Sequence, residues 1–190
     1  MQCKSSPSSV PSTPADFDRA YRAPLTLWGD VRVPPEVKAL VRPGIAQSSL
    51  ELGCGVGRFT RYLAQQGVQA TGVDWSAVAI AKAQAAASRA RFLVGDVTRL
   101  EALSGPFDFS FDVGCFHCLD LASQRAYAAE IARLLRPGGT HLIWALDHSP
   151  SDLSFSSELV TQAFEGHFTL REAKASRRRI VASHWYWLTR

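Results

Sequence analysis

The chain has 190 residues, 46% hydrophobic and 20% charged, which predicts one ordinary globular domain. No apolar run approaches the ~20 residues of a membrane span, and the Ser- and Pro-rich start lacks the apolar stretch of a secretory signal, so we expect neither. Four cysteines are too few for a disulfide scaffold, which favours a reduced, cytoplasmic setting. The net charge is only +4, and we interpret the basic run at residues 177–179 as a solvated face, so no nucleic-acid partner is expected.

The N-terminal part of the chain precedes the first clear strand. Residues 1–16 are expected to be a disordered tail, because Ser and Pro dominate them. Residues 17–45 contain Tyr21, Trp28 and Pro35, the last placed to open a short helix. An aromatic segment ahead of the core either covers a ligand site as a lid or anchors in the core, and both interpretations stay open.

Strands and helices then alternate as far as residue 150. Short apolar runs that end at glycine or aspartate predict strands, and the stretches between them predict helices. The expected strands are 48–52, 68–73, 91–94, 107–113 and 140–146, and the expected helices are 57–66, 77–87 and 123–135. This alternation is typical of a parallel sheet covered by helices on both faces, in which the strand-end loops meet at one crevice.

The pattern changes after residue 150. Residues 152–163 suit a helix, and two strands over 164–170 and 180–188 follow, joined by a basic connection. Adjacent, hairpin-like strands at the end of the chain predict an antiparallel edge on the otherwise parallel sheet.

Glycine occupies every second position in the turn after the first strand, at Gly53, Gly55 and Gly57. Glycine there allows a positive φ and close approach to a ligand, and the start of the next helix offers free N–H groups. We therefore expect a pocket for a nucleotide-type cofactor. Arg58 and Thr60 occupy the positions where a dinucleotide site has its third glycine, which weakens a nicotinamide interpretation.

Four motifs, in order, resemble those of class I S-adenosylmethionine-dependent methyltransferases. Residues 51–57 are similar to their first motif, 73–76 to the second, 95–97 to the acidic position after the third strand, and 133–139 to the signature before the fifth strand. The resemblance implies an α/β fold with a doubly wound, mostly parallel seven-stranded sheet and an antiparallel C-terminal edge hairpin, the Rossmann-like methyltransferase fold. It also implies S-adenosyl-L-methionine as cofactor and a methyltransferase domain over 17–190, with 17–45 as an N-terminal cap.

Two aspartates at strand ends are the main cofactor candidates. Asp74 is placed to accept hydrogen bonds from the ribose hydroxyls, and Asp96 from the adenine amino group. Trp75 and Val97 could flank the ring. The alternatives are a helix cap for Asp74 and a turn carboxylate for Asp96. The complete predicted cofactor-binding set is Glu51, Gly53, Cys54, Gly55, Gly57, Asp74, Trp75, Asp96, Val97 and Gly114.

Residues 112–118 follow the fourth strand, whose end faces the methyl group in this fold. His117 is a candidate base or substrate-orienting group, with a structural helix cap as the alternative. Cys115 and Cys118 lie with this histidine in four residues and cannot close a metal site without a second ligand cluster, so we expect no metal and inert cysteines.

The segment 114–117 also resembles small bacterial methyltransferases of the thiopurine and tellurite-resistance group. That resemblance implies a soft nucleophile, such as a thiol or chalcogenide. Asp147 and His148, just past the fifth strand, are further candidate site groups.

The sequence thus predicts a methyltransferase that acts on a small-molecule acceptor, as a monomer or homodimer, without a membrane or nucleic-acid partner. Two alternatives stay open: a nicotinamide-dependent reductase of the Rossmann type, and a protein that binds S-adenosylmethionine without turnover.

Overall fold

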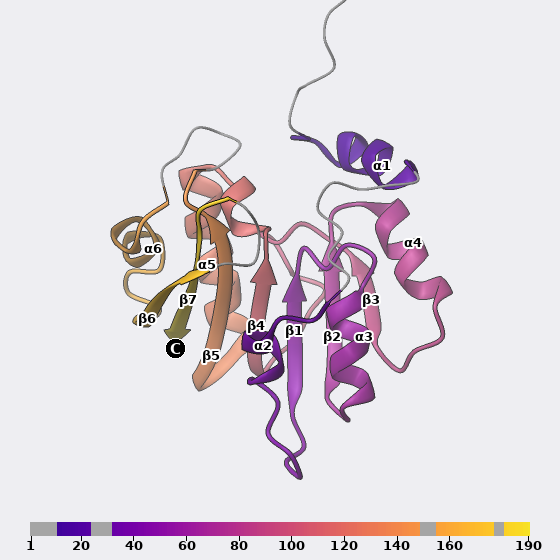
Figure 1. Cartoon of the computed structure of the whole chain (residues 1–190), viewed down its shortest axis with the longest axis horizontal. Coiled ribbons are helices and arrows are strands. Elements are labelled where there is room, and N and C mark those ends of the chain that lie inside the picture. The colour runs from indigo at the N-terminus through magenta and orange to yellow at the C-terminus, as the bar shows by residue number, and fades with distance from the viewer. Residues whose placement is uncertain (1–10, 24–31, 149–154, 177–180) are drawn as a thin grey trace, which may run out of the picture.

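The computed structural model describes residues 11–23, 32–148, 155–176 and 181–190 (Figure 1). The predictions for Trp28 and for the basic run 177–179 lie outside these ranges. Within them, no helix has the length and apolar character to cross a membrane.

A seven-stranded sheet forms the centre of the fold, in the order β3-β2-β1-β4-β5-β7-β6. The strands are β1 (Ser48–Leu52), β2 (Gln69–Asp74), β3 (Arg91–Val94), β4 (Phe107–Val113), β5 (Leu135–Leu146), β6 (Thr169–Ser176) and β7 (Ser183–Thr189). Strands β1 to β5 pair in parallel, and β7 runs antiparallel to both β5 and β6. The predicted fold class, including the antiparallel edge hairpin, is confirmed.

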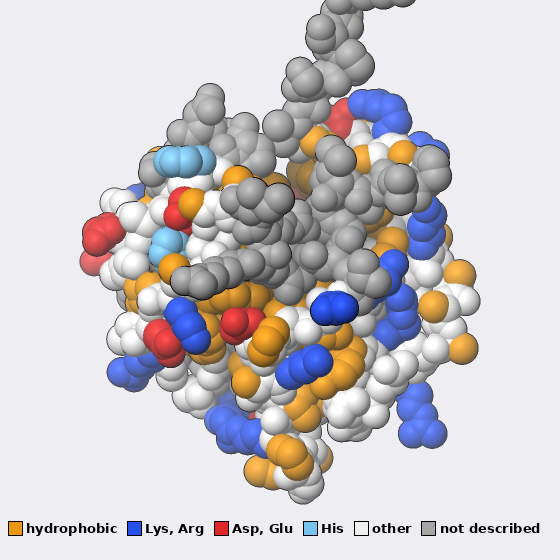
Figure 2. All heavy atoms as spheres, in the orientation of Figure 1, with side chains coloured by type: hydrophobic (Ala, Val, Ile, Leu, Met, Phe, Trp, Pro, Cys, Tyr) orange, Lys and Arg blue, Asp and Glu red, His pale blue; other side chains and the backbone are white. Residues whose placement is uncertain are grey.

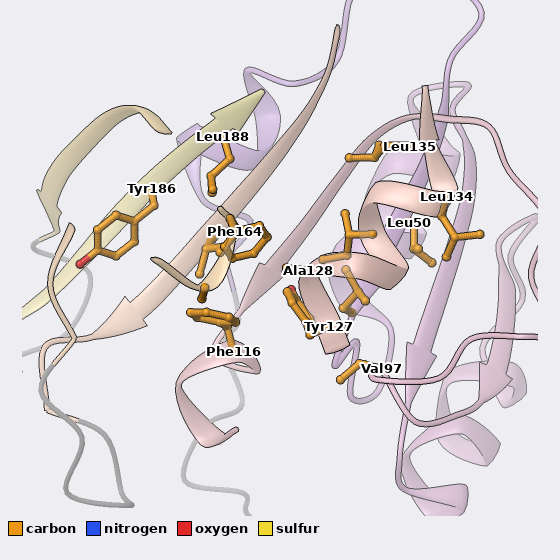
Figure 3. Close-up of a cluster of buried hydrophobic side chains, with 14 of the residues drawn as sticks. Leu50, Val97, Phe116, Tyr127, Ala128, Leu134, Leu135, Phe164, Tyr186 and Leu188 are labelled. Carbon is orange, nitrogen blue, oxygen red and sulfur yellow. The ribbon is translucent and has the colours of Figure 1, made fainter. Parts of the chain in front are cut away.

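Helices cover both faces of this sheet. They are α1 (Pro14–Arg22), α2 (Pro35–Lys38), α3 (Arg58–Gln65), α4 (Ala77–Ala85), α5 (Leu121–Leu134) and α6 (Ser157–Ala163), with a short 3₁₀ helix η1 (Phe116–Cys118). Figure 1 shows α2 and α3 in front of the sheet and α5 behind it. Apolar cores result on both faces: Phe59 and Leu63 of α3 pack beside Phe111 on one face, and Tyr127 packs beside Phe116 on the other (Figure 3).

Two helix starts differ from the prediction. Helix α1 begins at Pro14, where Thr13 and Asp16 form a capping box, so the end of the expected tail over 1–16 is helical. Helix α5 is capped by Asp120 and not by Ser123; the Asp120 carboxylate accepts the Ser123 N–H at 2.8 Å. Aspartate and serine cap equally well, which is why the sequence did not separate them.

Two strands also differ. β5 begins at Leu135, although the strand was expected only from residue 140. Residues 136–139 belong to the strand because this segment pairs with the C-terminal residue: Gly138 N–H donates to the Arg190 carbonyl at 3.0 Å. β6 covers residues 169–176, although the strand was expected over 164–170. The apolar residues of 164–170 misled the prediction: Phe164 ends α6 and is fully buried in the core.

Candidate functional site

The turn between β1 and α3 has the backbone that its glycines predicted. Gly53, Gly55 and Gly57 have φ values of 66°, 53° and 72°. A side chain on Gly57 would have to enter the ring of Phe92, only 2.4 Å from an ideal Cβ position. The turn is therefore restricted to glycine both by its conformation and by its neighbours.

Glu51 lies beneath this turn, at 3% exposure. Its carboxyl accepts the Thr60 N–H at 2.8 Å and the Thr60 hydroxyl. Gly57, the N-cap residue of α3, has no side chain for that purpose, so Glu51 satisfies a free N–H of the helix from below. Burial raises the pKa of Glu51 to about 8.

Asp74 joins the end of β2 to the same turn. One carboxylate oxygen accepts the Gly55 N–H at 2.7 Å, and the other accepts the Ser76 N–H at 2.8 Å. Burial raises the pKa of this carboxyl. The N-cap of α4 is Ser76, whose hydroxyl accepts the Ala79 N–H at 3.1 Å. The alternative that Asp74 caps this helix is therefore wrong.

The other predicted cofactor-binding residues at these strand ends differ in their burial. Asp96 closes a turn, because one of its oxygens accepts the N–H and the hydroxyl of Thr98 at 2.8 and 2.7 Å. Trp75 is 40% exposed. Val97 and Cys54 are instead buried in apolar clusters, so their side chains contribute packing.

Helix α1 lies across the start of α4, at the upper edge in Figure 1. The Asp18 carboxylate accepts the Ser76 hydroxyl at 2.5 Å and the Val78 N–H at 3.1 Å, and the Lys82 ammonium binds the carbonyl of Tyr21. The Tyr21 hydroxyl lies 2.7 Å from the place of a Cβ on Gly55, so this buried phenol covers the glycine turn. Sequence reasoning missed Asp18, because its partners follow about 60 residues later.

A fully buried aspartate shapes the loop after β4. Asp112 accepts the N–H groups of Gly114, Cys115 and Phe116 at 3.1, 3.2 and 3.0 Å, and the Tyr127 hydroxyl at 2.7 Å. Burial raises its pKa to about 6. Sequence reasoning missed this role, although a carboxylate at a strand end, just before a turn glycine, is a recognisable signal.

His117 is held between this loop and β5, at 5% exposure. The N–H of Leu146 donates to its Nδ1 at 3.4 Å, and its ring meets those of Trp144 and Phe155 edge to face. Asp120 caps α5, so the expected alternative of His117 as that cap does not hold.

Beyond β5, Asp147 contacts a histidine that sequence reasoning missed. The Nδ1 of His184, in the second residue of β7, lies 2.7 Å from an Asp147 carboxylate oxygen. His148 is exposed. The two partners of the pair are 37 residues apart, and no local motif connects them.

Residues 50–139 match the family model described as a methyltransferase domain. An uncharacterized methyltransferase of Schizosaccharomyces pombe is 34% identical over 92 residues, which cover 46% of this chain and 63% of that protein. The 2-heptyl-1-hydroxyquinolin-4(1H)-one methyltransferase of Mycobacteroides abscessus is 28% identical over 152 residues, 72% of this chain and 67% of that protein. The chain thus spans less than two thirds of the first of these relatives.

A solved structure extends this likeness to nearly the whole chain. Burkholderia thailandensis 1,6-didemethyltoxoflavin-N1-methyltransferase, with bound 1,6-didemethyltoxoflavin and S-adenosylhomocysteine, is 25% identical with a TM-score of 0.73. The similarity covers 93% of this chain and 86% of that one. The matched domain includes the glycine turn, Asp74, Asp96 and the loop after β4.

Proposed function

We propose that this chain, which has the domain and the fold of class I S-adenosylmethionine-dependent methyltransferases, transfers a methyl group to a small-molecule acceptor. The proposal depends on one observation, the contact between the glycine turn and the Asp74 carboxylate. A buried carboxylate and three glycines with positive φ meet there at the carboxyl ends of β1 and β2. A nucleoside binds at this place in open α/β sheets.

The residues of the crevice fit S-adenosylmethionine, which supplies an activated methyl group and its own leaving group. Asp74 is proposed to bind the ribose hydroxyls, Asp96 the adenine amino group and Trp75 the face of the ring. The turn at Gly53, Gly55 and Gly57 is proposed to bind the methionine part. Glu51 and Cys54 support that turn from below and do not need to touch the cofactor.

Positioning is proposed to supply most of the rate, because the methyl donor needs no further activation. Asp112 fixes the loop at Gly114 through its hydrogen bonds to three N–H groups, so that loop offers a rigid wall. His117, whose Nδ1 accepts the Leu146 N–H beside this loop, is proposed to orient the acceptor.

Heteroaromatic molecules are the acceptors that we propose first, since the relatives named above are methyltransferases of a hydroxyquinolone and of a toxoflavin precursor. The segment 114–117 also supports a place in the thiopurine and tellurite-resistance group, so thiols belong among the acceptors to be tried. Figure 2 shows Lys and Arg side chains interspersed with apolar and acidic ones over the described part of the face in view.

Two measurements test this function. Calorimetry should show binding of S-adenosylhomocysteine and no binding of NADH; the reverse result would establish the reductase alternative. Methyl transfer from labelled S-adenosylmethionine should then be detected with 2-heptyl-1-hydroxyquinolin-4(1H)-one, 1,6-didemethyltoxoflavin, aromatic amines or thiols. Binding without transfer to any of them would favour the non-catalytic alternative.

A further inference from the structure

Two histidines near the carboxyl ends of β4 and β5 have opposite hydrogen-bonding roles. A backbone N–H can only donate, so the Nδ1 of His117, which accepts the Leu146 N–H, carries no proton, and the proton of the neutral ring is on Nε2. The Nδ1 of His184 faces the Asp147 carboxylate at 2.7 Å and must donate to it. The Nε2 of a neutral His184 is therefore a hydrogen-bond acceptor.

The His184–Asp147 pair is also partly exposed. Its side chain is 35% exposed and that of Asp147 is 24% exposed. Within the described part of the chain, Asp147 is the one hydrogen-bond partner of the His184 ring. Tyr186, on the same strand, faces the ring at 6.1 Å between centroids, and no cation contacts the pair among the described residues.

The pair lies at the same edge of the sheet as the loop after β4. His184 stands opposite Ala145 in the β5–β7 ladder, and the Gly114 N–H donates to the Trp144 carbonyl at 3.1 Å. Phe155 connects the two histidines: its N–H donates to the Asp147 carbonyl at 2.8 Å, and its ring meets that of His117. Two strand spacings separate β7 from β4, which is roughly 10 Å.

We propose that the His184–Asp147 pair forms the far end of the acceptor site and binds an O–H or ring N–H donor on the acceptor, roughly 10 Å from β4. Asp147 orients the ring, and the His184 Nε2 accepts the hydrogen bond. The inference rests on the proposed function and narrows its substrate class. It favours a ring system with a donor remote from the methylated atom over a small thiol or inorganic chalcogenide, which cannot span the two ends.

Binding to the protein loaded with S-adenosylhomocysteine is the direct test. The probes are 6-mercaptopurine, which carries a ring N–H remote from its sulfur, and its 9-methyl derivative, in which that donor is blocked. The wild type should bind 6-mercaptopurine roughly 5- to 50-fold more tightly than the 9-methyl derivative, a ratio that corresponds to the free energy of one hydrogen bond. His184→Phe should abolish this preference, because phenylalanine keeps a ring but has no acceptor. His184→Gln should restore part of it through the amide oxygen.

The exposed His167, after α6, supplies the matched control, and His167→Phe should bind both probes as the wild type does. Asp147→Asn should lower the preference while affinity for S-adenosylhomocysteine stays unchanged. Equal affinity of the wild type for the two probes, or failure to bind either, would overturn the inference, as would an unchanged preference in His184→Phe. Absence of methyl transfer to any acceptor despite this preference would refute the proposed function and leave the binding role of His184 established.

Long-range ¹H–¹⁵N NMR spectra give a second readout that is independent of any acceptor. They should show the Nδ1–H tautomer for His184 and the Nε2–H tautomer for His117, with His184 changing in Asp147→Asn. An Nε2–H tautomer at His184 in the wild type would contradict the proposal, because Nε2 would then be a donor.

Discussion

Three buried carboxyl groups stand at the carboxyl ends of β1, β2 and β4: Glu51, Asp74 and Asp112. Each accepts backbone N–H groups from the turn or helix that follows or faces it, and burial raises the pKa of each. They hold the loops of the crevice by hydrogen bonds from within the fold. Of the three, only Asp74 is proposed to touch the cofactor as well.

Asp74→Asn tests that double role. The amide keeps one acceptor oxygen for the turn, but it loses the negative charge that strengthens hydrogen bonds from ribose hydroxyls. We expect affinity for S-adenosylhomocysteine to fall roughly 10- to 100-fold, or about 1–3 kcal/mol, as measured by calorimetry. Glu165→Gln removes an exposed carboxylate and should bind as the wild type does. Unchanged affinity of a folded Asp74→Asn would refute the ribose role.

Glu51 should make stability depend on pH. Its pKa is about 8 in the folded protein against 4.5 when solvated, so the folded state holds this proton more tightly. The resulting stabilisation is complete below pH ~4.5 and is lost as the pH rises through about 8. Relative to Glu51→Gln, the wild type should lose roughly 3–5 kcal/mol of unfolding free energy across this window. Urea titrations at several pH values measure it, and parallel curves for the two proteins would contradict it.

At the scale of elements, α1 is the helix whose contacts at the site were hardest to predict from the sequence. It is amphipathic and short, and it is held by Asp18 at the start of α4 and by Tyr21 on the glycine turn. Tyr21 is buried and lies against the turn, which is compatible with both interpretations that the sequence left open, a lid and a core anchor. We therefore expect α1 to govern entry and release of the cofactor.

Asp18→Ala should loosen this helix without unfolding the sheet. The substitution removes the carboxylate that accepts hydrogen bonds from the Ser76 hydroxyl and the Val78 N–H. These two hydrogen bonds link α1 to α4. Hydrogen exchange in α1 should become faster by roughly 5- to 50-fold, the worth of these hydrogen bonds. S-adenosylhomocysteine should also dissociate faster. Arg19→Ala, at an exposed position of the same helix, is the control. If hydrogen exchange in α1 of the Asp18 variant stays as slow as in the wild type, contacts other than those of Asp18 hold this helix.

At the scale of the whole molecule, the proposed cofactor site joins strand ends that are neighbours in the sheet but far apart in the chain. Ligand binding there should stabilise the entire fold, because only the folded chain brings the β1, β2 and β4 ends together. S-adenosylhomocysteine at about 100 times its dissociation constant should add ~2.7 kcal/mol. For a domain of this size that corresponds to a rise in melting temperature of roughly 5–10 °C in calorimetric scans. NADH at the same concentration should leave the melting temperature unchanged; the opposite ranking would contradict the proposed cofactor.

The sequence by itself determined the parallel sheet, the positive-φ turn and the strand-end aspartates. These depend on local patterns: apolar runs of strand length, glycine where the backbone needs it, and a glycine or an aspartate at the end of each run. Boundaries such as the start of α5 were less certain, because Asp120 and Ser123 cap a helix equally well.

Only the tertiary structure decided how the side chains are used. Glu51 lies under Thr60, Asp18 reaches α4, and Asp147 meets His184, because strand pairing and helix packing bring together residues far apart in the chain. Such pairings leave no periodic or compositional trace, since each partner alone is an ordinary polar residue. The local pattern therefore predicted where the proposed cofactor site lies, and the packing of the sheet determined which groups surround that place.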